Sequence, residues 1–484
     1  MPQLYRRQDI WTLEEQQPWH PVTEAYAVAV GALQARAASD PTSWAYQAAI
    51  HAVSAGRTDK FRDQCQHGSW FFLPWHRMYL YWFERIVRAA LSADPRVPDD
   101  VKKSWALPYW NYGRGGRYSM LPAPFREQTH DGRPNPLYVG QRARVINGGG
   151  ALPAETVSAT RALQKQLFAV AAIPGRTAGF GGPVTGWNHE PSSAFGALEQ
   201  TPHNDVHGQV GGAGGFMSQF DTAQLDPIFW LHHANIDRLW AVWLTQTNRS
   251  NPTQPKWRDF KFHFHDENGK ALQSTPAHVL DTAADLGYMY EPAPTAPTPA
   301  AAPPGAAAVI PPEPPPEHPP ELVAATDQPL TLAGRPITLA LDVASPQSPQ
   351  VRATPESARR AYLNVEGITG EQNPGISYGV YVNLPDRPVA TTTGDAHHVG
   401  NISFFGIERV SDTTREHGGS DGLRHAFNIT ALVESLRAAG TWDPGKLSVT
   451  FKPLRPTPPE GQEDLAAEEP VLPVTIRRVS LYLL

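Results

Sequence analysis

Residues 199–240 constrain this chain more than any other stretch, because they hold four closely spaced histidines. His203 and His207 stand four residues apart, so on one helical turn both imidazoles point to the same side. His232 and His233 follow in a second run with helical periodicity. Three of these side chains could converge on one metal ion, and neutral imidazole suits copper, zinc, iron and nickel.

The spacing does not by itself choose a metal. A zinc protease of the HExxH type needs a glutamate directly after the first histidine as general base, whereas Asn204 stands there. Histidine pairs at this spacing also occur as surface or capping residues, and the pair alone leaves that interpretation open. A second set of histidines upstream favours the metal site.

The upstream set consists of His51, His67 and His76. His51 ends a run of helical periodicity that we expect to begin after an N-cap at Asp40. His76 opens a strongly periodic run that ends at Leu91, and His67 lies in the connection. Two sets of three histidines on separate helices predict a binuclear site inside a helix bundle, where facing helices build metal sites.

The two stretches resemble the two metal-binding halves of the type-3 copper proteins, the family of tyrosinases, polyphenol oxidases and haemocyanins. The first half matches FxxWHRxxLxxxE from Phe72 to Glu84, and the second matches HNxVH and DPxFWxHHxxxDRxW. The resemblance implies two copper ions, with O2 as co-substrate and small phenols as substrates. It assigns three ligands to each copper: His51, His67 and His76 to the first, and His203, His207 and His233 to the second.

The same resemblance places His232 beside the second copper rather than on it, because the family pattern puts the ligand four residues before Asp237. Asp237, Arg77 and Glu84 are charges on otherwise apolar helices. Buried charges need partners, so we expect them to form ion pairs or to support the ligands.

The sequence predicts an α+β multidomain chain. Residues 1–290 should form a mainly α catalytic domain with a central four-helix bundle that holds the dicopper site. Residues 291–320 contain 13 prolines, so 291–328 should be an extended linker open to proteolysis. Residues 329–484 alternate short apolar runs with turns, which is typical of an all-β sandwich or barrel, with one helix at 429–439. In relatives such a domain shields the copper site.

Composition excludes several other classes of function. The net charge of −6 over 484 residues includes no basic run, so nothing indicates a nucleic-acid partner or an anionic membrane. The sequence contains no stretch of eighteen or more apolar residues, so it predicts no membrane span. The first residues lack an apolar signal core, so we expect a cytoplasmic protein or one released without a visible signal peptide. The oligomeric state stays open.

Cys65 is the single cysteine, so no intramolecular disulfide can form. It could be an inert buried thiol. The resemblance implies a second possibility, a thioether that joins Cys65 to His67, because the C-x-H spacing is similar to that of fungal relatives.

Three further residues are candidates for the catalytic machinery by resemblance. Glu199 and Asn204 flank His203 and match the pair that positions a water for phenol deprotonation. Equally, Glu199 could be a helix-terminal carboxylate and Asn204 part of a polar helix face. Phe220 matches a bulky gate residue, expected above the second copper, although it could also be loop packing.

Other side chains are interpreted more plainly. The aromatic residues between 70 and 83 are predicted to be core rather than a substrate platform, since large aromatics dominate core burial. His130 and His189 lie in a Gly- and Pro-rich region and are interpreted as surface or packing histidines.

Three functions remain compatible with the sequence. The first is an oxidase that hydroxylates monophenols and oxidises o-diphenols to o-quinones, possibly made as a latent proenzyme. The second is a catechol or o-aminophenol oxidase without monophenolase activity. The third is a haemocyanin-like oxygen-binding protein, which a single site beside a cleavable linker fits less well.

Overall fold

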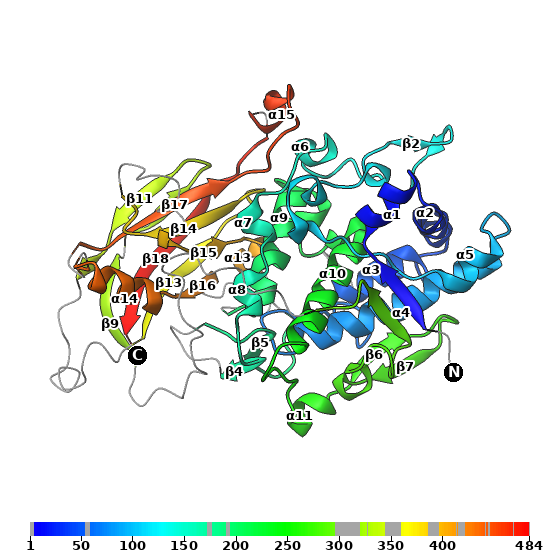
Figure 1. Ribbon diagram of the computed structural model, residues 1–484, viewed down its shortest axis with the longest axis horizontal. Helices are drawn as coiled ribbons and strands as arrows, with labels where there is room; N and C mark the ends of the chain where they lie inside the picture. The colour runs from blue at the N-terminus through cyan, green and yellow to red at the C-terminus, as the bar shows by residue number, and fades with distance from the viewer. Residues whose placement is uncertain are drawn as a thin grey trace.

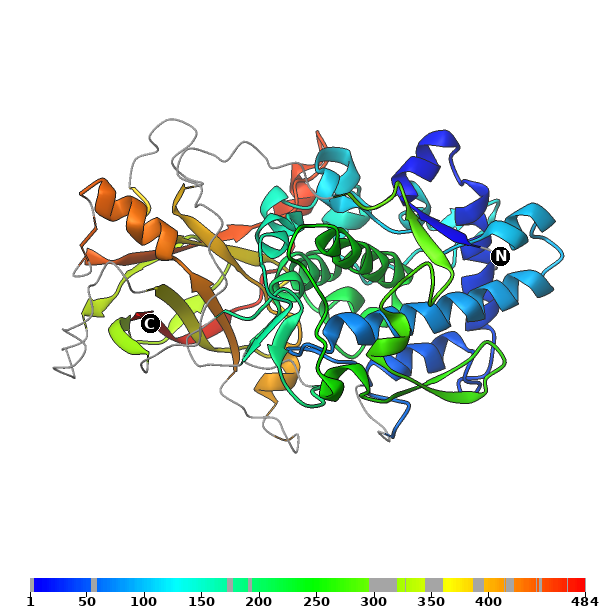
Figure 2. The ribbon, with the colours of Figure 1, turned by 60° about the horizontal axis from the view of Figure 1, so that its bottom comes forward.

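The computed structural model divides into a helical region and a β-rich region that lie end to end (Figure 1). A second view keeps the same division (Figure 2). The structure describes residues 4–53, 59–171, 177–189, 194–295, 320–326, 328–343, 360–385, 396–412, 414, 422–440, 442–443, 446–467 and 469–483. The expectation of a helical core followed by a β-rich C-terminal part is confirmed.

The helical region is built around two long helices that pack against each other, α4 and α10. Asp226 caps α10 by accepting from the backbone N of Ile228, and Pro227 occupies the first turn. Ser43, rather than the expected Asp40, caps α3, because its hydroxyl accepts from the backbone N of Tyr46. The helices are α1 (Ile10–Gln16), α2 (Pro21–Gln34), α3 (Trp44–His51), α4 (Phe72–Ala93), α5 (Asp99–Ser104), α6 (Arg144–Asn147), α7 (Ala154–Val157), α8 (Thr160–Leu163), α9 (Asp205–Gly211), α10 (Pro227–Leu244) and α11 (Pro255–Arg258).

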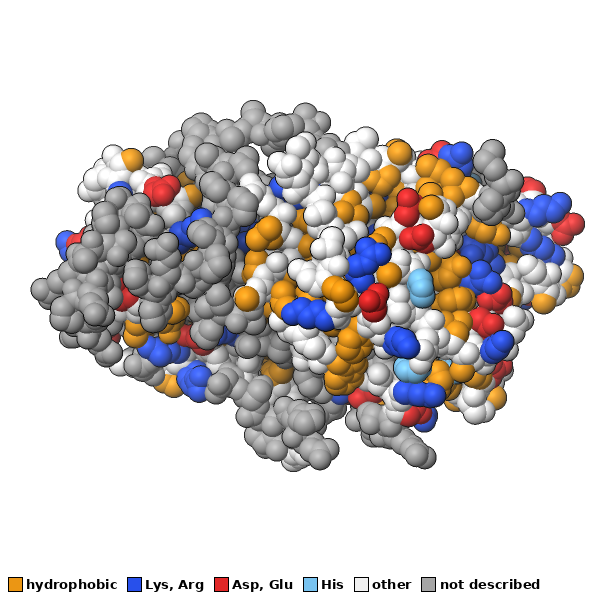
Figure 3. Space-filling view, turned by 90° about the horizontal axis from the view of Figure 1, so that it is seen from below, with side chains coloured by type: hydrophobic (Ala, Val, Ile, Leu, Met, Phe, Trp, Pro, Cys, Tyr) orange, Lys and Arg blue, Asp and Glu red, His pale blue; other side chains and the backbone are white. Residues whose placement is uncertain are grey.

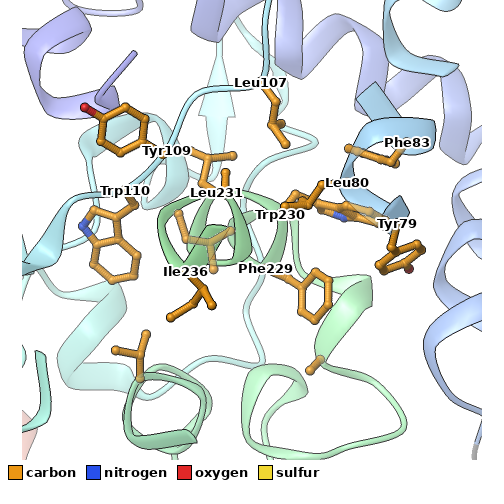
Figure 4. Close-up of a cluster of buried hydrophobic side chains, with 14 of the residues drawn as sticks. Tyr79, Leu80, Phe83, Leu107, Tyr109, Trp110, Phe229, Trp230, Leu231 and Ile236 are labelled. Atoms are coloured by element: carbon orange, nitrogen blue, oxygen red, sulfur yellow. The ribbon is translucent and has the colours of Figure 1, made fainter. Parts of the chain in front are cut away.

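Aromatic side chains form the core between α4 and α10, as Figure 4 shows. Trp230 of α10 stacks on Phe83 of α4 with ring centroids 3.4 Å apart and lies 4.7 Å from Tyr79. Such pairs contribute roughly 0.5–1.5 kcal/mol beyond the area that they bury. Trp70, Trp75 and Phe83 are at most 1% exposed, which confirms the prediction of core for them, whereas Tyr81 and Trp82 are only partly buried against the core.

Buried charges join the start and the end of the helical region. The strand β1 (Tyr5–Gln8) runs parallel to β8 (Tyr288–Glu291). Arg7 contacts Glu84 at 2.7 Å, and Arg77 contacts Asp237 at 2.5 Å. Tyr290 donates to the same Asp237 carboxylate. The expected ion pairs of Arg77, Glu84 and Asp237 are therefore present.

The β-rich region consists of two sheets that share one hydrophobic core. One sheet has the order β12-β9-β18-β13-β16, with β10 also paired to β18, and the other has the order β11-β17-β14-β15. Helix α14 (Thr430–Ala438) confirms the helix expected at 429–439. The elements are β9 (Glu321–Thr326), β10 (Leu330–Leu332), β11 (Ile337–Ala340), β12 (Asp342–Val343), β13 (Ala361–Thr369), β14 (Ser377–Val382), β15 (His398–Ile402), α13 (Ile407–Ser411), β16 (Leu423–Asn428), β17 (Ser448–Leu454), α15 (Glu463–Ala467) and β18 (Val474–Leu483).

The segment between the two regions ends earlier than the expected linker. Residues 296–319, which hold most of the predicted linker, lie outside the described residues. The strand β9 begins at Glu321, ahead of the expected boundary at 329, and pairs with β18. The last residues of the expected linker therefore belong to the β-rich region.

Direct hydrogen bonds join the two regions. Gln209 Nε2 of α9 donates to the backbone oxygen of Leu454 at 2.7 Å. Asn401 Nδ2 donates to the backbone oxygen of Glu155 at 2.9 Å. Arg161 donates to the backbone oxygen of Val399. These contacts hold the β-rich region against the face of the helical region that carries α9.

The outer surface is mixed in character. Seen from below, the helical region carries both basic and acidic side chains interspersed with apolar ones (Figure 3). Among the described helices, none combines the length and the apolar character needed to span a bilayer.

Candidate metal centre

Six buried histidines from six segments meet between the helices of the helical region. His51 is the last residue of α3, His76 lies in α4 and His67 lies in the connection between them. The other three are His203 in the helical segment η4 (Glu199–Asn204), His207 in α9 and His233 in α10. Each of the six is at most 3% exposed.

In the first set, two of the Nε2 atoms lie close together and the third ring lies beside them. His51 Nε2 and His67 Nε2 lie 3.5 Å apart. The His76 ring centroid lies 5.6 Å from that of His51 and 5.3 Å from that of His67. His76 Nε2 is buried without a hydrogen-bond partner in the part of the chain that the structure describes. An inward-facing nitrogen of this kind suits a metal ligand.

The second set has the same form. His207 Nε2 and His233 Nε2 lie 3.3 Å apart, and the His203 ring centroid lies 4.5 Å from that of His207. His203 Nε2 is buried and has no hydrogen-bond partner among the described residues. The sets adjoin, because the rings of His76 and His233 stack with centroids 4.5 Å apart. The predicted ligands are thus brought together as two neighbouring groups of three.

Hydrogen bonds on the outer side orient several of these rings. His76 Nδ1 lies 2.8 Å from the backbone oxygen of Phe72, and His207 Nδ1 lies 2.9 Å from that of Met217. A carbonyl oxygen only accepts, so Nδ1 carries the hydrogen and the Nε2 lone pair is free for a metal.

Burial keeps all six imidazoles neutral. Desolvation lowers the pKa of each of the six histidines below its usual value. For the five histidines other than His76, the neighbouring imidazoles lower the pKa further. For His76 desolvation lowers the pKa to about 3, opposed only by the hydrogen bond to Phe72. Because metal binding needs neutral imidazole, these donors fit two metal ions at neutral pH.

His232 lies beside the second set. Its Nδ1 is 3.2 Å from the Tyr112 hydroxyl, and its ring lies 4.8 Å from that of His207. The possible ligand atoms of His203, His207, His232 and His233 all lie within 4.8 Å of one another. Distance alone therefore does not decide whether His232 or His233 is the metal ligand. The two histidines differ in that His232 contacts the Tyr112 hydroxyl.

Glu199 and Asn204 each contact one histidine. Glu199 Oε1 lies 2.9 Å from His67 Nδ1 and also accepts from the backbone N of Gly68 at 2.9 Å. Burial raises the pKa of Glu199 to about 8, although backbone N–H groups at Gly68 and Gly196 oppose the shift. Asn204 Oδ1 lies 2.8 Å from His203 Nδ1. Neither side chain is exposed, so both are held against these histidines and away from solvent.

Cys65 is buried beside the first set. Its possible ligand atom lies within 4.8 Å of those of His51 and His67. The Sγ atom also lies 3.3 Å from His189 Nδ1. The interpretation of His189 as a packing histidine misses these polar contacts: it is 3% exposed, and its Nε2 lies 2.8 Å from Asp63 Oδ1. No local pattern could have shown them, since the partners are far apart in sequence.

Phe220 is buried against the first set, which corrects the expectation that it lies above the second copper. Its ring centroid is 4.8 Å from that of His67 and 5.6 Å from that of His51. The backbone N of Phe220 donates to Glu408 Oε1 at 2.7 Å, so a residue of the β-rich region fixes this loop. The sequence spacing carried no information on that contact.

Phe405 is a site residue that sequence reasoning missed. It precedes α13 in the β-rich region, yet it packs in the core of the helical region and is 1% exposed. Its ring stacks on His207 with centroids 4.1 Å apart and an interplanar angle of 21°, and it lies 5.5 Å from Phe220. Two phenylalanines thus cover the centre, Phe220 over the first set and Phe405 over the second.

Three family models match successive parts of the chain. Residues 41–246 match the common central domain of tyrosinase, and residues 251–300 match the polyphenol oxidase middle domain. Residues 319–483 match a domain of unknown function, DUF7868.

Curated relatives and solved structures agree with these matches. The tyrosinase HcTyr1 of Hahella sp. (strain CCB-MM4) is 32% identical over 94% of this chain and 96% of its own length. A chloroplastic polyphenol oxidase of Malus domestica is 28% identical over 77% of this chain and 66% of its own length. The structure of latent apple tyrosinase matches 99% of this chain and 97% of its own with a TM-score of 0.61 at 22% identity, which supports the fold.

Proposed function

Since this chain belongs to the tyrosinase and polyphenol oxidase family of copper oxidoreductases, we propose that it uses O2 to hydroxylate monophenols and to oxidise o-diphenols to o-quinones. The observation that carries the proposal is the pair of adjoining histidine sets, buried and neutral, with one close pair of Nε2 atoms in each set. Copper ions held there would supply the redox chemistry by which dioxygen oxidises a phenol.

We assign the first copper to His51, His67 and His76, and the second to His203, His207 and His233. His232 and Asp237 support this arrangement from outside it. Backbone carbonyls at Phe72 and Met217 hold two of the rings in the tautomer that a metal needs.

Glu199 and Asn204 are proposed to handle the proton of a monophenol. Their contacts with His67 and His203 put one of them beside each histidine set. A buried carboxyl whose pKa lies near neutrality can both accept and return a proton. Phe220, over the first set, is proposed as a gate that selects substrates by size.

The β-rich region is proposed to make the full chain latent. Phe405 occupies the space against His207 that a substrate ring would need, and it is held there from outside the helical region. We propose a division into a catalytic domain, a Pro-rich linker that begins at 291 and ends before β9 at Glu321, and a C-terminal β domain. We also infer that α3, α4, α9 and α10 form the four-helix bundle and that the two sheets form a sandwich.

Cys65 is proposed to be joined to His67 by a thioether. Formation of the bond from the thiol Sγ to an imidazole carbon removes two hydrogens, with dioxygen as the oxidant. The intact mass of copper-loaded protein should therefore be lower than the sequence mass by two hydrogens. An unchanged mass, with Cys65 still alkylatable after denaturation, would contradict the crosslink.

Two alternatives remain. A catechol or o-aminophenol oxidase is favoured mildly by the bulk of Phe220 over the first set. An oxygen-binding protein is favoured only by the cover that Phe405 provides.

Oxygen uptake separates these functions. The copper-reconstituted chain is given a monophenol and the matching catechol, before and after limited proteolysis between 296 and 319. Uptake with both phenols supports the proposal, and uptake with catechol alone makes the chain a diphenol oxidase. Uptake with neither, on a chain with two coppers bound, favours the oxygen-binding protein. Equal rates before and after cleavage would contradict latency.

A further inference from the structure

We propose that two side chains of α13, Glu408 and Arg409, position the gate residue Phe220, so that the β-rich region forms part of the wall that selects the substrate. This inference rests on the proposed function, because it assigns a specificity role within the same site. It differs from shielding, since a shield only covers the site and can be removed without changing its shape.

The first contact is between Glu408 and the backbone of the gate. Phe220 N donates to Glu408 Oε1 at 2.7 Å. The other carboxylate oxygen, Oε2, is buried and has no hydrogen-bond partner in the described part of the chain. The carboxyl end of Glu408 is therefore committed to the loop of Phe220 rather than to solvent.

The second contact is between Arg409 and the ring of the gate. Arg409 is 3% exposed, and its Cζ lies 4.8 Å from the Phe220 ring centroid, within the range of a cation–π interaction. Its Nη1 lies 3.4 Å from Asp221 Oδ1, on the residue that follows the gate. Ring and backbone of the gate are thus both held by α13.

Arg409 also joins the gate to the segment that carries His67. Its Nη1 lies 2.7 Å from His189 Nε2, and its Nη2 lies 3.5 Å from Asp63 Oδ1. His189 Nδ1 in turn lies 2.9 Å from the backbone oxygen of Cys65. One buried guanidinium therefore links three segments around the first histidine set, and Phe220 is held between Arg409 and the ring of His67.

Glu408 and Arg409 together are called the brace. A turn separates the brace from Phe405, the side chain that covers the second set. Gly406 has φ of 82°, a left-handed conformation that glycine adopts without strain. On one side of it Phe405 enters the metal centre, and on the other Ile407 packs into the core of the β-rich region. Cover and brace are consequently different side chains, and single substitutions can remove one and leave the other.

The test uses the full-length, copper-loaded chain with Phe405→Ala as background, so that the site is open. Glu408→Ala, which loses the acceptor for Phe220 N, is compared with Glu408→Gln, which keeps it. Two readouts are taken: hydrogen exchange at the Phe220 amide, and kcat and KM for a small catechol and for a bulky ring-substituted catechol.

With Glu408→Ala, exchange at the Phe220 amide should rise by roughly tenfold, because a lost hydrogen bond is worth about one such factor. The KM of the bulky catechol should fall relative to that of the small one, while kcat for the small catechol stays the same. Glu408→Gln should match the background in both readouts, which a purely structural role would not require.

The proposal is overturned if Glu408→Ala and Glu408→Gln show the same exchange and the same selectivity. If Glu408→Ala does not fold and bind two coppers, Arg409→Met is compared with Arg409→Lys by the same readouts, and identical results again overturn it. Failure of the proposed function is distinguishable, because a background chain with two coppers would then oxidise no phenol while the exchange comparison still reports on the brace.

Discussion

The two histidine sets are built in different ways from the same kind of ligand. The second set takes His203 and His207 from one continuous helical stretch and His233 from α10. The first set takes only His76 from the body of a helix, while His51 ends α3 and His67 lies in a loop.

The residues that hydrogen-bond the histidines differ between the two sets in the same way: they are close in sequence for the second set and distant for the first. Asn204 contacts His203 from the next position, and Met217 accepts from His207 ten positions along. His67 instead depends on Glu199, which is 132 positions away. The second set is therefore supported mainly by its own segments, whereas the first set is assembled from distant parts of the chain, including the β-rich region through Arg409.

The largest expected effect tests the ligand assignment within the second set. His233→Ala should bind one copper per chain instead of two and should lose phenol oxidation entirely, since a ligand has been removed. His232→Ala is the control and should keep both coppers, with a loss of at most about 100-fold, as for a residue outside the ligand shell. Metal content of the purified chains measures this, and one copper in both variants would contradict the assignment.

The next largest effect concerns Phe405, the side chain that covers the second set. Phe405→Ala should raise catechol oxidation by the uncleaved chain by about tenfold or more, because the ring that stacks on His207 is gone. Phe405→Leu keeps an apolar side chain there and should give a smaller gain. Steady-state rates before and after proteolysis check this, and a cleaved wild-type chain no faster than the intact one would argue against it.

A smaller effect concerns Glu199, whose side chain contacts His67 of the first set. Glu199→Gln should reduce monophenol hydroxylation by roughly 10–100-fold, because the amide keeps an acceptor oxygen for His67 and Gly68 but can no longer accept and return a proton. Catechol oxidation, which needs less help with deprotonation, should fall less. The ratio of the two rates is the measurement, and an equal loss of both would indicate a purely structural role.

The smallest effect is a pH dependence of the brace over the first set. Burial raises the pKa of Glu408 to about 7, helped by Asp221 and opposed by the Phe220 backbone N–H and by Arg409. Because the pKa of Glu408 is raised in the folded chain, its contribution to stability is fully present at pH values below its ordinary pKa of about 4.5. That contribution is lost as the pH rises through about 7.

This pH dependence can be measured as the difference in the free energy of unfolding between the wild-type chain and Glu408→Gln, from denaturant titrations at pH 5 and pH 8. The variant cannot titrate at this position, so the wild-type chain should lose stability relative to it as the pH rises. A difference that is the same at both pH values would contradict the prediction.

The sequence carried more information on the second set than on the first. His203 and His207 are readable because helical geometry turns a spacing of four into a shared face. His67 has no such period, and only its resemblance to a known motif indicated a role. Phe405, His189 and Arg409 act through contacts between segments that are far apart in the chain, and no local pattern encodes such contacts.

The parallel pairing of β1 with β8 has a consequence for how this chain can be rearranged. Tyr5 lies opposite Tyr288, and Arg7 contacts Asp237 and Tyr290 beside them, so the beginning and the end of the helical region are neighbours in space. Units with adjacent ends tolerate circular permutation and insertion. The helical region could accordingly be permuted or extended at this edge, whereas its separation from the β-rich region would remove Phe405 from its aromatic core.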